Sequence, residues 1–483
     1  MLQTYIAYRL IIATALTVLA AASASAHAVL NKRDSRAAFA WVAVIWMAPL
    51  VGATFYVLFG INRIQRRAAR MRAEVLRYTP SESPFRHDSE ALRSALPEEA
   101  RHLDALAHLV DGVTRRPLEH GNTVEMLVDG DQAYPAMLEA IRSARRTVVL
   151  SSFIFAGDRA GKEFVDALSE AVTRGIQVRV IIDAVGARLS LPSAVGALAQ
   201  ARVPVARFAP MLRPLLMRYV NLRSHRKILV VDGVVGFTGG INIQNECVVG
   251  NSPRRIVHDL HFRLTGPVVR HLVECFAEDW AFCTGKSLDG GVWWPAPERS
   301  GPVVARGVTD GPDEDIDKTR QTIMGALACA RRSVSIITPY FVPDASLVTT
   351  LTLAAMRGVE VRILLPEANN HATVKWASAA LLWQVLERGC RVFMSPPQFD
   401  HSKLMVVDDA WTLLGSANWD ARSLRLNFEF NVECYDAALA RSAGEHFSRK
   451  LAAAREVTLA EMDGRSLPVR IRDGVARLLA PFL

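Results

Sequence analysis

The sequence predicts an α/β protein in which two similar halves, each a mixed or parallel β-sheet flanked by helices, follow two transmembrane helices. With 483 residues, the chain is too long for one ordinary hydrophobic core. Two long uncharged apolar runs lie near the N-terminus, and one succession of strand and helix patterns occurs twice afterwards. We therefore expect a membrane anchor over 1–77, a linker with a helical segment over 78–122, a first half over 123–295 and a second half over 296–483.

The anchor is expected to contain two membrane-spanning helices, over about 10–31 and about 37–62. Each apolar run is long enough to cross a bilayer as a helix. Pro49 should bend the second helix slightly, because proline removes one helical hydrogen bond. An alternative for the first run is a cleaved signal peptide, since Ala24-Ser25-Ala26 has the small residues of a signal peptidase site.

The positive charge of the chain is concentrated beside these apolar runs. The formal net charge is +9, and residues 1–77 account for +8 of it with ten basic and two acidic residues. The cluster Arg63–Arg72 should stay in the cytoplasm and orient the second helix. Because the remaining chain is nearly neutral, the basic excess favours anionic lipid headgroups, or an orienting role alone, over a nucleic-acid partner.

The two halves are predicted from a repeated order of elements. A β-branched strand pattern at 144–155, a helical stretch and a strand pattern at 174–183 are matched by the same succession from 330–341 to 357–366. Strands that alternate with helices indicate a parallel or mixed sheet covered by helices. The segment 293–302 is the expected boundary between the halves.

A motif of six positions, His-x-Lys-x₄-Asp-x₆-Gly-[Gly/Ser]-x-Asn, occurs once in each half with identical spacing. Its two copies are His225, Lys227, Asp232, Gly239, Gly240 and Asn242, and His401, Lys403, Asp408, Gly415, Ser416 and Asn418. A short motif is weak evidence when it occurs once, and the repetition makes this one specific. Because each half supplies one histidine and one lysine, we expect the halves to pack with the two motifs facing each other.

This doubled motif and the stretches around it resemble the phospholipase D superfamily, and within it the bacterial cardiolipin synthases. The stretches that carry the resemblance are NLRSHRKILVVDG (221–233), HDLHFRLTGPVV (258–269), FDHSKLMVVDD (399–409) and GSANWDARSLRLNFEFNVE (415–433). The resemblance implies a bilobal phospholipase D-like fold. It also implies a multi-pass enzyme of the bacterial inner membrane whose catalytic part lies in the cytoplasm.

The motif residues suit phosphoryl transfer without a metal or a cofactor. One imidazole can attack phosphorus and form a phosphohistidine, while the other handles the proton of the leaving group. By resemblance, His225 is the nucleophile and His401 is the acid and base. Lys227 and Lys403 would neutralise the charge on the pentacoordinate phosphorus. The polar side chains expected to donate hydrogen bonds to the same oxygens are Asn242, Ser416 and Asn418.

Asp232 and Asp408 complete the two motif copies and are therefore candidates for the catalytic set. Each stands at the predicted end of a strand, five residues after the motif lysine. Aspartate at such a position commonly binds the backbone of a turn through its side chain. We expect these two carboxylates to stabilise a turn or form a salt bridge, rather than to face the substrate.

The family resemblance implies that a more distant carboxylate orients each histidine. Asp259 is expected to serve His225, and Glu429 is expected to serve His401. A carboxylate on the second ring nitrogen fixes the tautomer and stabilises the imidazolium ion, as in other catalytic triads. The alternative for each acid is an ordinary residue of a surface or an interface.

Two further segments have a possible lipid contact. Arg207, Arg213, Arg218 and Arg223 occur among prolines and apolar residues before the first motif. They could form a lid at the lipid surface or a packed loop with solvated arginines. The amphipathic C-terminal stretch 469–483 could touch the membrane or pack on the body of the protein.

The activity implied by the resemblance is a phosphatidyl transfer between two phosphatidylglycerol molecules, which yields cardiolipin and releases glycerol. The alternative is phospholipase D-type hydrolysis to phosphatidic acid. The motif residues serve either reaction, and the outcome depends on whether the cleft excludes water and admits a second lipid. The membrane runs favour the transferase. A nuclease of the same superfamily would need a basic body, which the sequence after residue 77 lacks.

Overall fold

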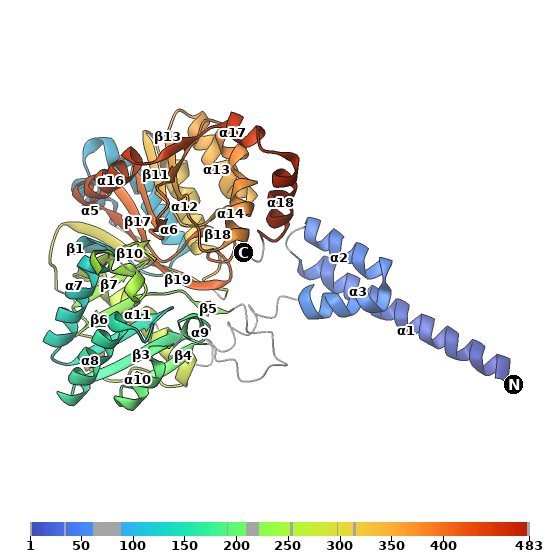
Figure 1. The fold of residues 1–483 in the computed structure, drawn as a ribbon, viewed down its shortest axis with the longest axis horizontal. Helices are drawn as coiled ribbons and strands as arrows, with labels where there is room; N and C mark the ends of the chain where they lie inside the picture. The colour runs from blue at the N-terminus through green and yellow to red at the C-terminus, as the bar shows by residue number, and fades with distance from the viewer. Residues whose placement is uncertain are drawn as a thin grey trace. The chain divides into compact units, whose positions relative to one another are not determined.

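The computed structural model describes residues 2–32, 35–60, 88–190, 192–208, 222–251, 255–296, 298–312 and 315–480. The chain divides into two compact units, Met1–Ala68 and Ala69–Leu483 (Figure 1). The basic cluster Arg63–Arg72 and the start of the expected linker lie outside the described residues, as do Arg213 and Arg218 of the arginine-rich segment.

In its described residues, the N-terminal unit has one long helix and two shorter helices. Of the described helices, only α1 (Leu2–Asn31) is long and apolar enough to cross a membrane. It is followed by α2 (Ser35–Met47), α3 (Pro49–Phe55) and a π-helical turn, Tyr56–Gly60. Small side chains of α1 pack against the two shorter helices. Small residues allow such close approach of helices in a membrane.

The prediction of one continuous second membrane helix over about 37–62 is wrong. The chain leaves the helical conformation at Ala48, and α3 folds back on α2. The approach is so close that a Cβ atom on Gly52 would lie 2.3 Å from the carbonyl oxygen of Val44. Pro49 explains the break, because it has no N–H to donate and its ring crowds the carbonyl four residues earlier. Proline is well suited to begin the next helix instead.

The larger unit is built on a 16-stranded mixed sheet, counted over the described residues, to which both halves contribute. From the junction outward, the first half supplies β1 (Glu119–Val128), β9 (Leu260–Thr265), β7 (Val235–Gly239), β6 (Ile228–Val231), β2 (Thr147–Ser152), β3 (Gln177–Asp183) and β4 (Val205–Phe208). The second half supplies β10 (Val303–Asp310), β19 (Asn427–Tyr435), β17 (Trp411–Gly415), β16 (Leu404–Val407), β11 (Ser333–Ile337), β13 (Glu360–Pro366), β14 (Arg391–Ser395) and β20 (Arg455–Val457).

The halves repeat one topology, which confirms the predicted mixed sheet. β2, β3 and β4 are parallel, as are β11, β13 and β14, and the strands nearer the junction are antiparallel. The sheets of the two halves join edge to edge through the antiparallel pair β1 and β10. Among the described residues there are also three parallel ladders of two residues each. They pair β5 (Arg223–Ser224) with β19, β8 (Val257–His258) with β15 (Phe399–Asp400), and β12 (Phe341–Val342) with β18 (Trp419–Asp420).

Each half buries its own hydrophobic core, and Figure 1 shows helices beside the strands of each half. The helices of the first half are α7 (Asp129–Ser143), α8 (Arg159–Thr173), α9 (Gly186–Leu189), α10 (Ala194–Gln200) and α11 (Val269–Thr284). Those of the second half are α12 (Lys318–Cys329), α13 (Ala345–Met356), α14 (Ala372–Ala379), α15 (Leu382–Leu386), α16 (Ala437–Ala452), α17 (Leu459–Asp463) and α18 (Leu467–Leu478).

The helical segment before the first half packs onto the second half. It consists of α5 (Ser89–Ala95), a 3₁₀ helix (Glu98–Leu103) and α6 (Asp104–Val113). Leu106 and Val110 of α6 share a core with residues of α12, because apolar residues at helical spacing form one face. The segment expected as a linker is therefore a structural part of the second half.

The C-terminal helix α18 packs on the body, which confirms one of the two alternatives for this stretch, and it also exposes an apolar face. Asp473 and Ala476 are buried, and the Arg472 guanidinium lies 4.7 Å from the centre of the Trp376 ring on α14. The side chains on the outward face are each more than half exposed, and they are Leu467, Ile471, Val475 and Leu478.

Candidate active site

Two of the short parallel ladders connect the halves and bring the motif copies together. In the ladder between β5 and β19, Ser224 of the first half lies opposite Phe428 of the second. In the ladder between β8 and β15, His258 of the first half lies opposite Asp400 of the second. In both ladders the next residue is a motif histidine on one chain segment and a carboxylate on the other.

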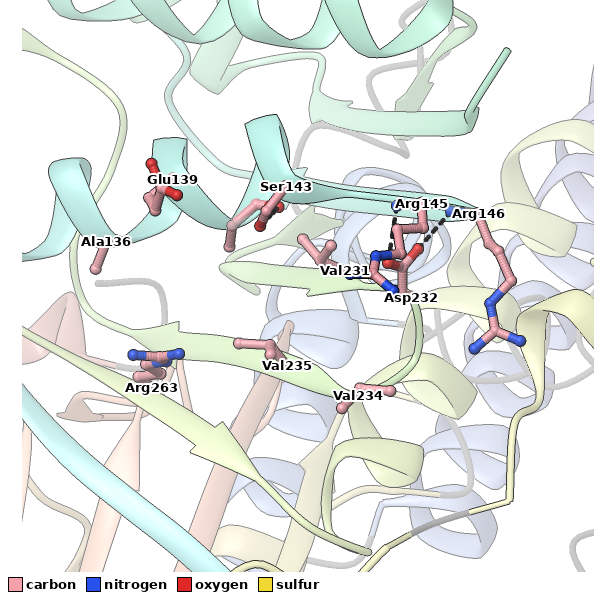
Figure 2. Close-up of a pocket in the computed structure, with 11 residues that line it drawn as sticks. Ala136, Glu139, Ser143, Arg145, Arg146, Val231, Asp232, Val234, Val235 and Arg263 are labelled. Atoms are coloured by element: carbon pink, nitrogen blue, oxygen red, sulfur yellow. Dashed lines mark hydrogen bonds between the residues drawn. The ribbon is translucent and has the colours of Figure 1, made fainter. Parts of the chain in front are cut away.

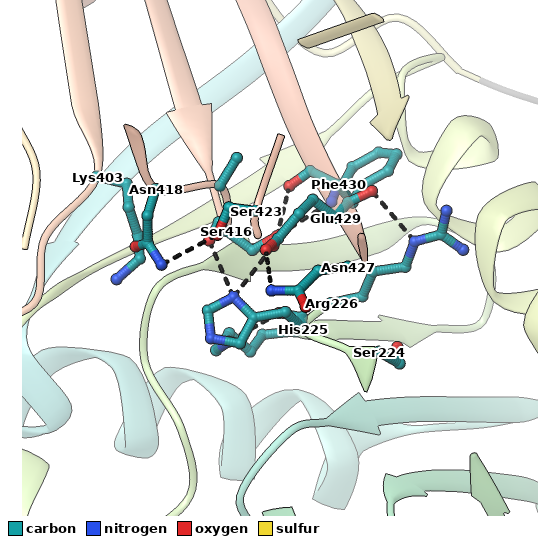
Figure 3. A network of polar contacts seen from close by, with 12 residues as sticks. Ser224, His225, Arg226, Lys403, Ser416, Asn418, Ser423, Asn427, Glu429 and Phe430 are labelled. Atoms are coloured by element: carbon teal, nitrogen blue, oxygen red, sulfur yellow. Dashed lines mark hydrogen bonds and ion pairs between the residues drawn. The ribbon is translucent and has the colours of Figure 1, made fainter. Parts of the chain in front are cut away.

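The first of these pairs is His225 with Glu429. The ring Nδ1 of His225 lies 3.1 Å from Oε2 of Glu429. The carboxylate also accepts hydrogen bonds from Ser416 Oγ (2.6 Å) and Asn427 Nδ2 (3.1 Å), as Figure 3 shows. Burial alone would raise the pKa of Glu429, but the charge of His225 and its hydrogen bond hold that pKa below the usual value. Glu429 therefore remains a carboxylate that can fix the His225 tautomer.

The second pair is His401 with Asp259. The ring Nδ1 of His401 lies 2.7 Å from Oδ2 of Asp259 and 2.8 Å from Nζ of Lys403. Burial raises the pKa of Asp259 to about 7, against the opposing charge of Lys403. Burial also holds the pKa of His401 well below its usual value, with Lys403 acting in the same direction. Burial thus disfavours the charged form of both members of this pair.

These contacts correct the predicted pairing of histidines and carboxylates. We expected Asp259 to serve His225 and Glu429 to serve His401, within each half. The structure exchanges them, because each histidine segment forms its ladder with the carboxylate segment of the other half. Sequence proximity therefore pointed to the wrong partner although the two carboxylates were the right residues.

The two histidines face one cleft at the junction of the halves. Their ring centroids are 6.3 Å apart, and the rings are inclined at 81°. Both rings line a cleft of about 690 Å³, together with Asn242 and Asn418. Since the carboxylates engage Nδ1 of each ring, Nε2 is the nitrogen left for a substrate. A tetrahedral phosphate placed between the rings can contact one imidazole on each side.

The two motif lysines are buried beneath this cleft. Lys227 Nζ donates to the carbonyl oxygen of His225 (2.7 Å), and Lys403 Nζ donates to that of His401. Burial lowers the pKa of Lys227 to about 7 and that of Lys403 to about 8. Buried ammonium groups without full compensation attract an anion strongly. The lysines are therefore placed to stabilise charge on a bound phosphoryl group.

Ser416 does not line the cleft, which corrects its expected contact with phosphate oxygens. Its side chain is fully buried, and its hydroxyl donates to Glu429 and accepts from the backbone N–H of Phe430. The matching position of the first motif is Gly240, where a Cβ atom would lie 2.1 Å from Oδ1 of Asp259. The Ser/Gly difference between the motifs thus follows from the different carboxylates that they accommodate.

Asp232 and Asp408 lie away from the histidines, at the turns that end β6 and β16. The Asp232 carboxylate accepts the backbone N–H groups of Arg145, Arg146 and Thr147 at 2.7–2.9 Å. Figure 2 shows Asp232 in a separate surface pocket with these arginines. Both aspartates have positive φ values, 54° and 53°. Both carboxylates bind turns, as their position at a strand end predicted, and neither lines the cleft, which corrects their place among the candidate catalytic residues.

Asp408 makes the equivalent contacts in the second half. Its carboxylate accepts the backbone N–H groups of Arg331, Arg332 and Ser333 at 2.7–2.9 Å. His102 Nε2 lies 2.9 Å from the same carboxylate. A buried carboxylate with this many donors is well compensated. Asp408 therefore links the turn after β16 to β11 and to the 3₁₀ helix Glu98–Leu103.

Arg255 and Arg422 also line the cleft, although neither was among the predicted site residues. Arg223 of the arginine-rich segment lines it as well, whereas Arg207 lies in β4. The signal that could have revealed Arg422 is its place four residues after the motif residue Asn418. Arg422 reaches the cleft through the turn before β19, which the sequence did not predict.

The fold and the cleft define a phosphoryl-transfer centre formed between two repeated halves, and comparisons with known proteins agree. Residues 137–280 and 323–451 match the family model described as cardiolipin synthase, PLD-like domain. Residues 15–60 match the model described as phospholipase D-nuclease N-terminal. The chain belongs to the cardiolipin synthase family of phospholipase D-like proteins, as the sequence resemblance predicted.

Individual relatives cover nearly the whole chain. The major cardiolipin synthase ClsA of Bacillus subtilis (strain 168) is 32% identical over 460 residues, which cover 94% of this chain and 95% of that protein. Cardiolipin synthase A of Pseudomonas fluorescens (strain SBW25) is 33% identical over 467 residues, with 95% of each chain covered.

A crystal structure of phosphatidylserine synthase from Haemophilus influenzae Rd KW20 has the same fold. It superposes with a TM-score of 0.62 at 16% identity and covers 78% of this chain and 100% of that one. The similarity extends over the two-halved unit rather than one half alone.

Proposed function

We propose that the protein is a membrane-bound cardiolipin synthase that transfers a phosphatidyl group from one phosphatidylglycerol to a hydroxyl group of another. The observation that carries the proposal is the reciprocal pairing of two cleft histidines with buried carboxylates of the opposite half. This arrangement supplies one oriented nucleophile and one proton carrier above two buried lysines. The cardiolipin synthases among its relatives supply the reaction class.

The first step forms a phosphohistidine on His225. Its Nε2 attacks phosphorus, and the bond between phosphorus and the glycerol headgroup oxygen breaks. His401 gives its Nε2 proton to that oxygen, so glycerol leaves as a neutral alcohol. The nucleophile is assigned to His225 because Glu429, with its lowered pKa, remains charged and keeps a proton on Nδ1.

The second step transfers the phosphatidyl group to the acceptor. His401, now neutral, removes the proton from a hydroxyl group of the second phosphatidylglycerol, whose oxygen attacks phosphorus. The bond to His225 breaks, and the acid form of His401 is restored. Lys227, Lys403, Asn242 and Asn418 stabilise the charge on the equatorial oxygens in both steps. The phosphodiester energy is kept in the phosphohistidine, so no nucleotide is consumed.

We further propose that α1 crosses the bacterial inner membrane once and that α2 and α3 re-enter it from the cytoplasmic side. Basic residues follow α1 at Lys32 and follow the re-entrant pair at Arg63–Arg72. Both basic segments then lie on the same side, as the positive-inside rule favours. In this arrangement α1 alone spans the membrane, in place of the two spanning helices predicted from the sequence. The catalytic unit then lies in the cytoplasm. A cysteine introduced at Ser35 should react with an impermeant reagent only after the cells are opened.

The reaction is tested with the purified full-length protein in detergent, phosphatidylglycerol as the only lipid and a chelator present. Equal amounts of cardiolipin and glycerol, with little phosphatidic acid, are expected. Phosphatidic acid as the main product would establish the alternative, a phospholipase D-type hydrolase. Absence of any product from this lipid would exclude phosphatidylglycerol as the donor.

A further inference from the structure

Two arginines from opposite halves line the cleft outside both motifs. Arg223 belongs to β5, and its ladder partner on β19 is Asn427. The backbone N–H of Asn427 donates to the carbonyl oxygen of Arg422 at 2.9 Å. One hydrogen-bonded turn therefore places Arg422 beside the ladder that holds Arg223. Both side chains line the cleft that contains His225 and His401.

Two carboxyl groups near this arginine pair, Asp183 and Asp420, act on its charge and also accept backbone hydrogen bonds. Asp183 accepts the N–H groups of Val185, Gly186 and Ser224 at 2.9–3.0 Å. Asp420 accepts the N–H of Ser423 at 2.7 Å. Burial raises the pKa of both carboxyl groups, that of Asp420 to about 7.

The arginines themselves are partly withdrawn from water. Burial lowers the pKa of both side chains, and the charge of Arg422 lowers that of Arg223 further. The Arg223 guanidinium donates to the carbonyl oxygen of Leu222 (3.0 Å), which is its own neighbour in the chain. Arg255 adds a third guanidinium to the same cleft. An anion bound in the cleft beside these guanidinium groups would add to the stabilisation that Asp183 and Asp420 give them.

We propose that Arg223 and Arg422 form a second anion subsite, which binds the phosphate group carried by the acceptor alcohol. The proposal rests on the proposed transferase activity and adds the basis of acceptor selection. The donor phosphate occupies the space between the histidines and above the lysines. An acceptor phosphatidylglycerol brings a second phosphodiester, which glycerol and water lack. Guanidinium groups bind such oxygens in a bidentate manner.

This subsite explains how one cleft can favour a lipid over water as acceptor. Binding energy from the acceptor phosphate positions its hydroxyl group against the phosphohistidine. Water has no phosphate group for the arginines to bind, so its reaction with the phosphohistidine is not favoured by this subsite. Glycerol, the product of the first step, also has no phosphate group and gains no binding energy from the two arginines.

The experiment compares two reactions of the full-length enzyme in mixed micelles. The first is cardiolipin formation from phosphatidylglycerol, and the second is exchange of radiolabelled glycerol into phosphatidylglycerol. Arg223→Gln and Arg422→Gln should each lower cardiolipin formation about 10- to 100-fold, the usual loss for a charged hydrogen bond. Glycerol exchange, which needs only the donor site, should change less than about threefold. Arg422→Lys should recover part of the loss, and Arg441→Gln on the exposed face of α16 is the matched control.

Equal losses in the two reactions would overturn the proposal, because they would indicate damage to the donor site or to folding. Unchanged cardiolipin formation in both variants would also overturn it. Wild-type protein that exchanges glycerol but forms no cardiolipin would refute the proposed function itself, separately from the subsite. Transfer to glycerol 3-phosphate identifies the group that the arginines bind. If the variants lose this transfer as much as cardiolipin formation, the subsite binds any phosphate group. If they lose cardiolipin formation alone, it binds the lipid phosphodiester.

Discussion

The Nδ1 atom of His401 lies 2.7 Å from a carboxylate oxygen of Asp259, which is 142 residues away in the other half. The reciprocal pair, His225 and Glu429, spans 204 residues. Each motif histidine therefore takes its carboxylate partner from the opposite half. The active unit requires both halves, which are joined in one sheet through β1 and β10.

Replacement of Asp259 by asparagine should strongly reduce the transfer rate while the protein remains folded. The amide preserves the shape of the side chain but cannot stabilise the His401 imidazolium ion, a change that costs on the order of 10⁴ in a serine protease triad. We expect a loss of about 10²–10⁴ in kcat for cardiolipin formation. Asp232→Asn is the matched control, because it alters a motif carboxylate outside the cleft. Equal effects of the two substitutions would contradict the assignment.

Loss of the Asp408 carboxylate should affect stability rather than chemistry. Asp408→Ala leaves three backbone donors without their acceptor and places alanine at a positive φ. We expect the free energy of unfolding to fall by about 2–4 kcal/mol. The shift in Tm, followed by tryptophan fluorescence, measures it. The rate per folded molecule should stay within about threefold of the wild type, and a far larger loss at unchanged Tm would restore a catalytic role for Asp408.

Binding of a phosphodiester should draw protons into the cleft near pH 8. In the free protein the pKa of Lys227 is about 7 and that of Lys403 about 8, so both are partly neutral at this pH. A bound anion raises each lysine pKa, and a rising pKa means proton uptake. Calorimetric titration with a phosphonate analogue in two buffers of different ionisation enthalpy measures the uptake. Lys403→Arg should reduce it, because arginine does not titrate. Proton release on binding would refute the prediction.

The covalent intermediate should form on His225. In His401→Ala the second step lacks its base, whereas a donor with an activated leaving group needs no acid in the first step. A phosphatidyl adduct should therefore accumulate on the peptide that contains His225, as detected by mass spectrometry at alkaline pH. His225→Ala, as the matched variant, should yield no adduct. An adduct on His401 in that variant would reverse the two roles.

The outward face of α18 should contact the lipid surface. Its exposed apolar residues Ile471 and Val475 are accompanied by the exposed cations Arg470 and Arg477, a combination that binds anionic membranes. A polarity-sensitive fluorophore on Val475→Cys should shift to shorter wavelength when the full-length protein is reconstituted in anionic vesicles. The same probe on Ser448→Cys of α16 is the control. Identical spectra at the two positions would show that α18 does not reach the bilayer.

Much of this protein could be predicted from its local sequence. The repeated strand and helix patterns determine two halves with mixed sheets, because side-chain periodicity and β-branched composition act over a few residues. The doubled motif identifies the histidines, the lysines and the two asparagines that now line or underlie one cleft. Even the structural role of Asp232 followed from its place at the end of a strand.

Other features depend on contacts between distant segments and were decided by the tertiary structure. Pro49 was visible in the sequence, yet the fold-back of α3 on α2 depends on Gly52 permitting close packing. The exchange of Asp259 and Glu429 depends on two ladders of two residues each, which are too short to leave a pattern in the sequence. The sequence determined which groups carry out the chemistry, and the packing of the halves decided which group assists which, because a hydrogen bond depends on ångström distances that the chain order does not contain.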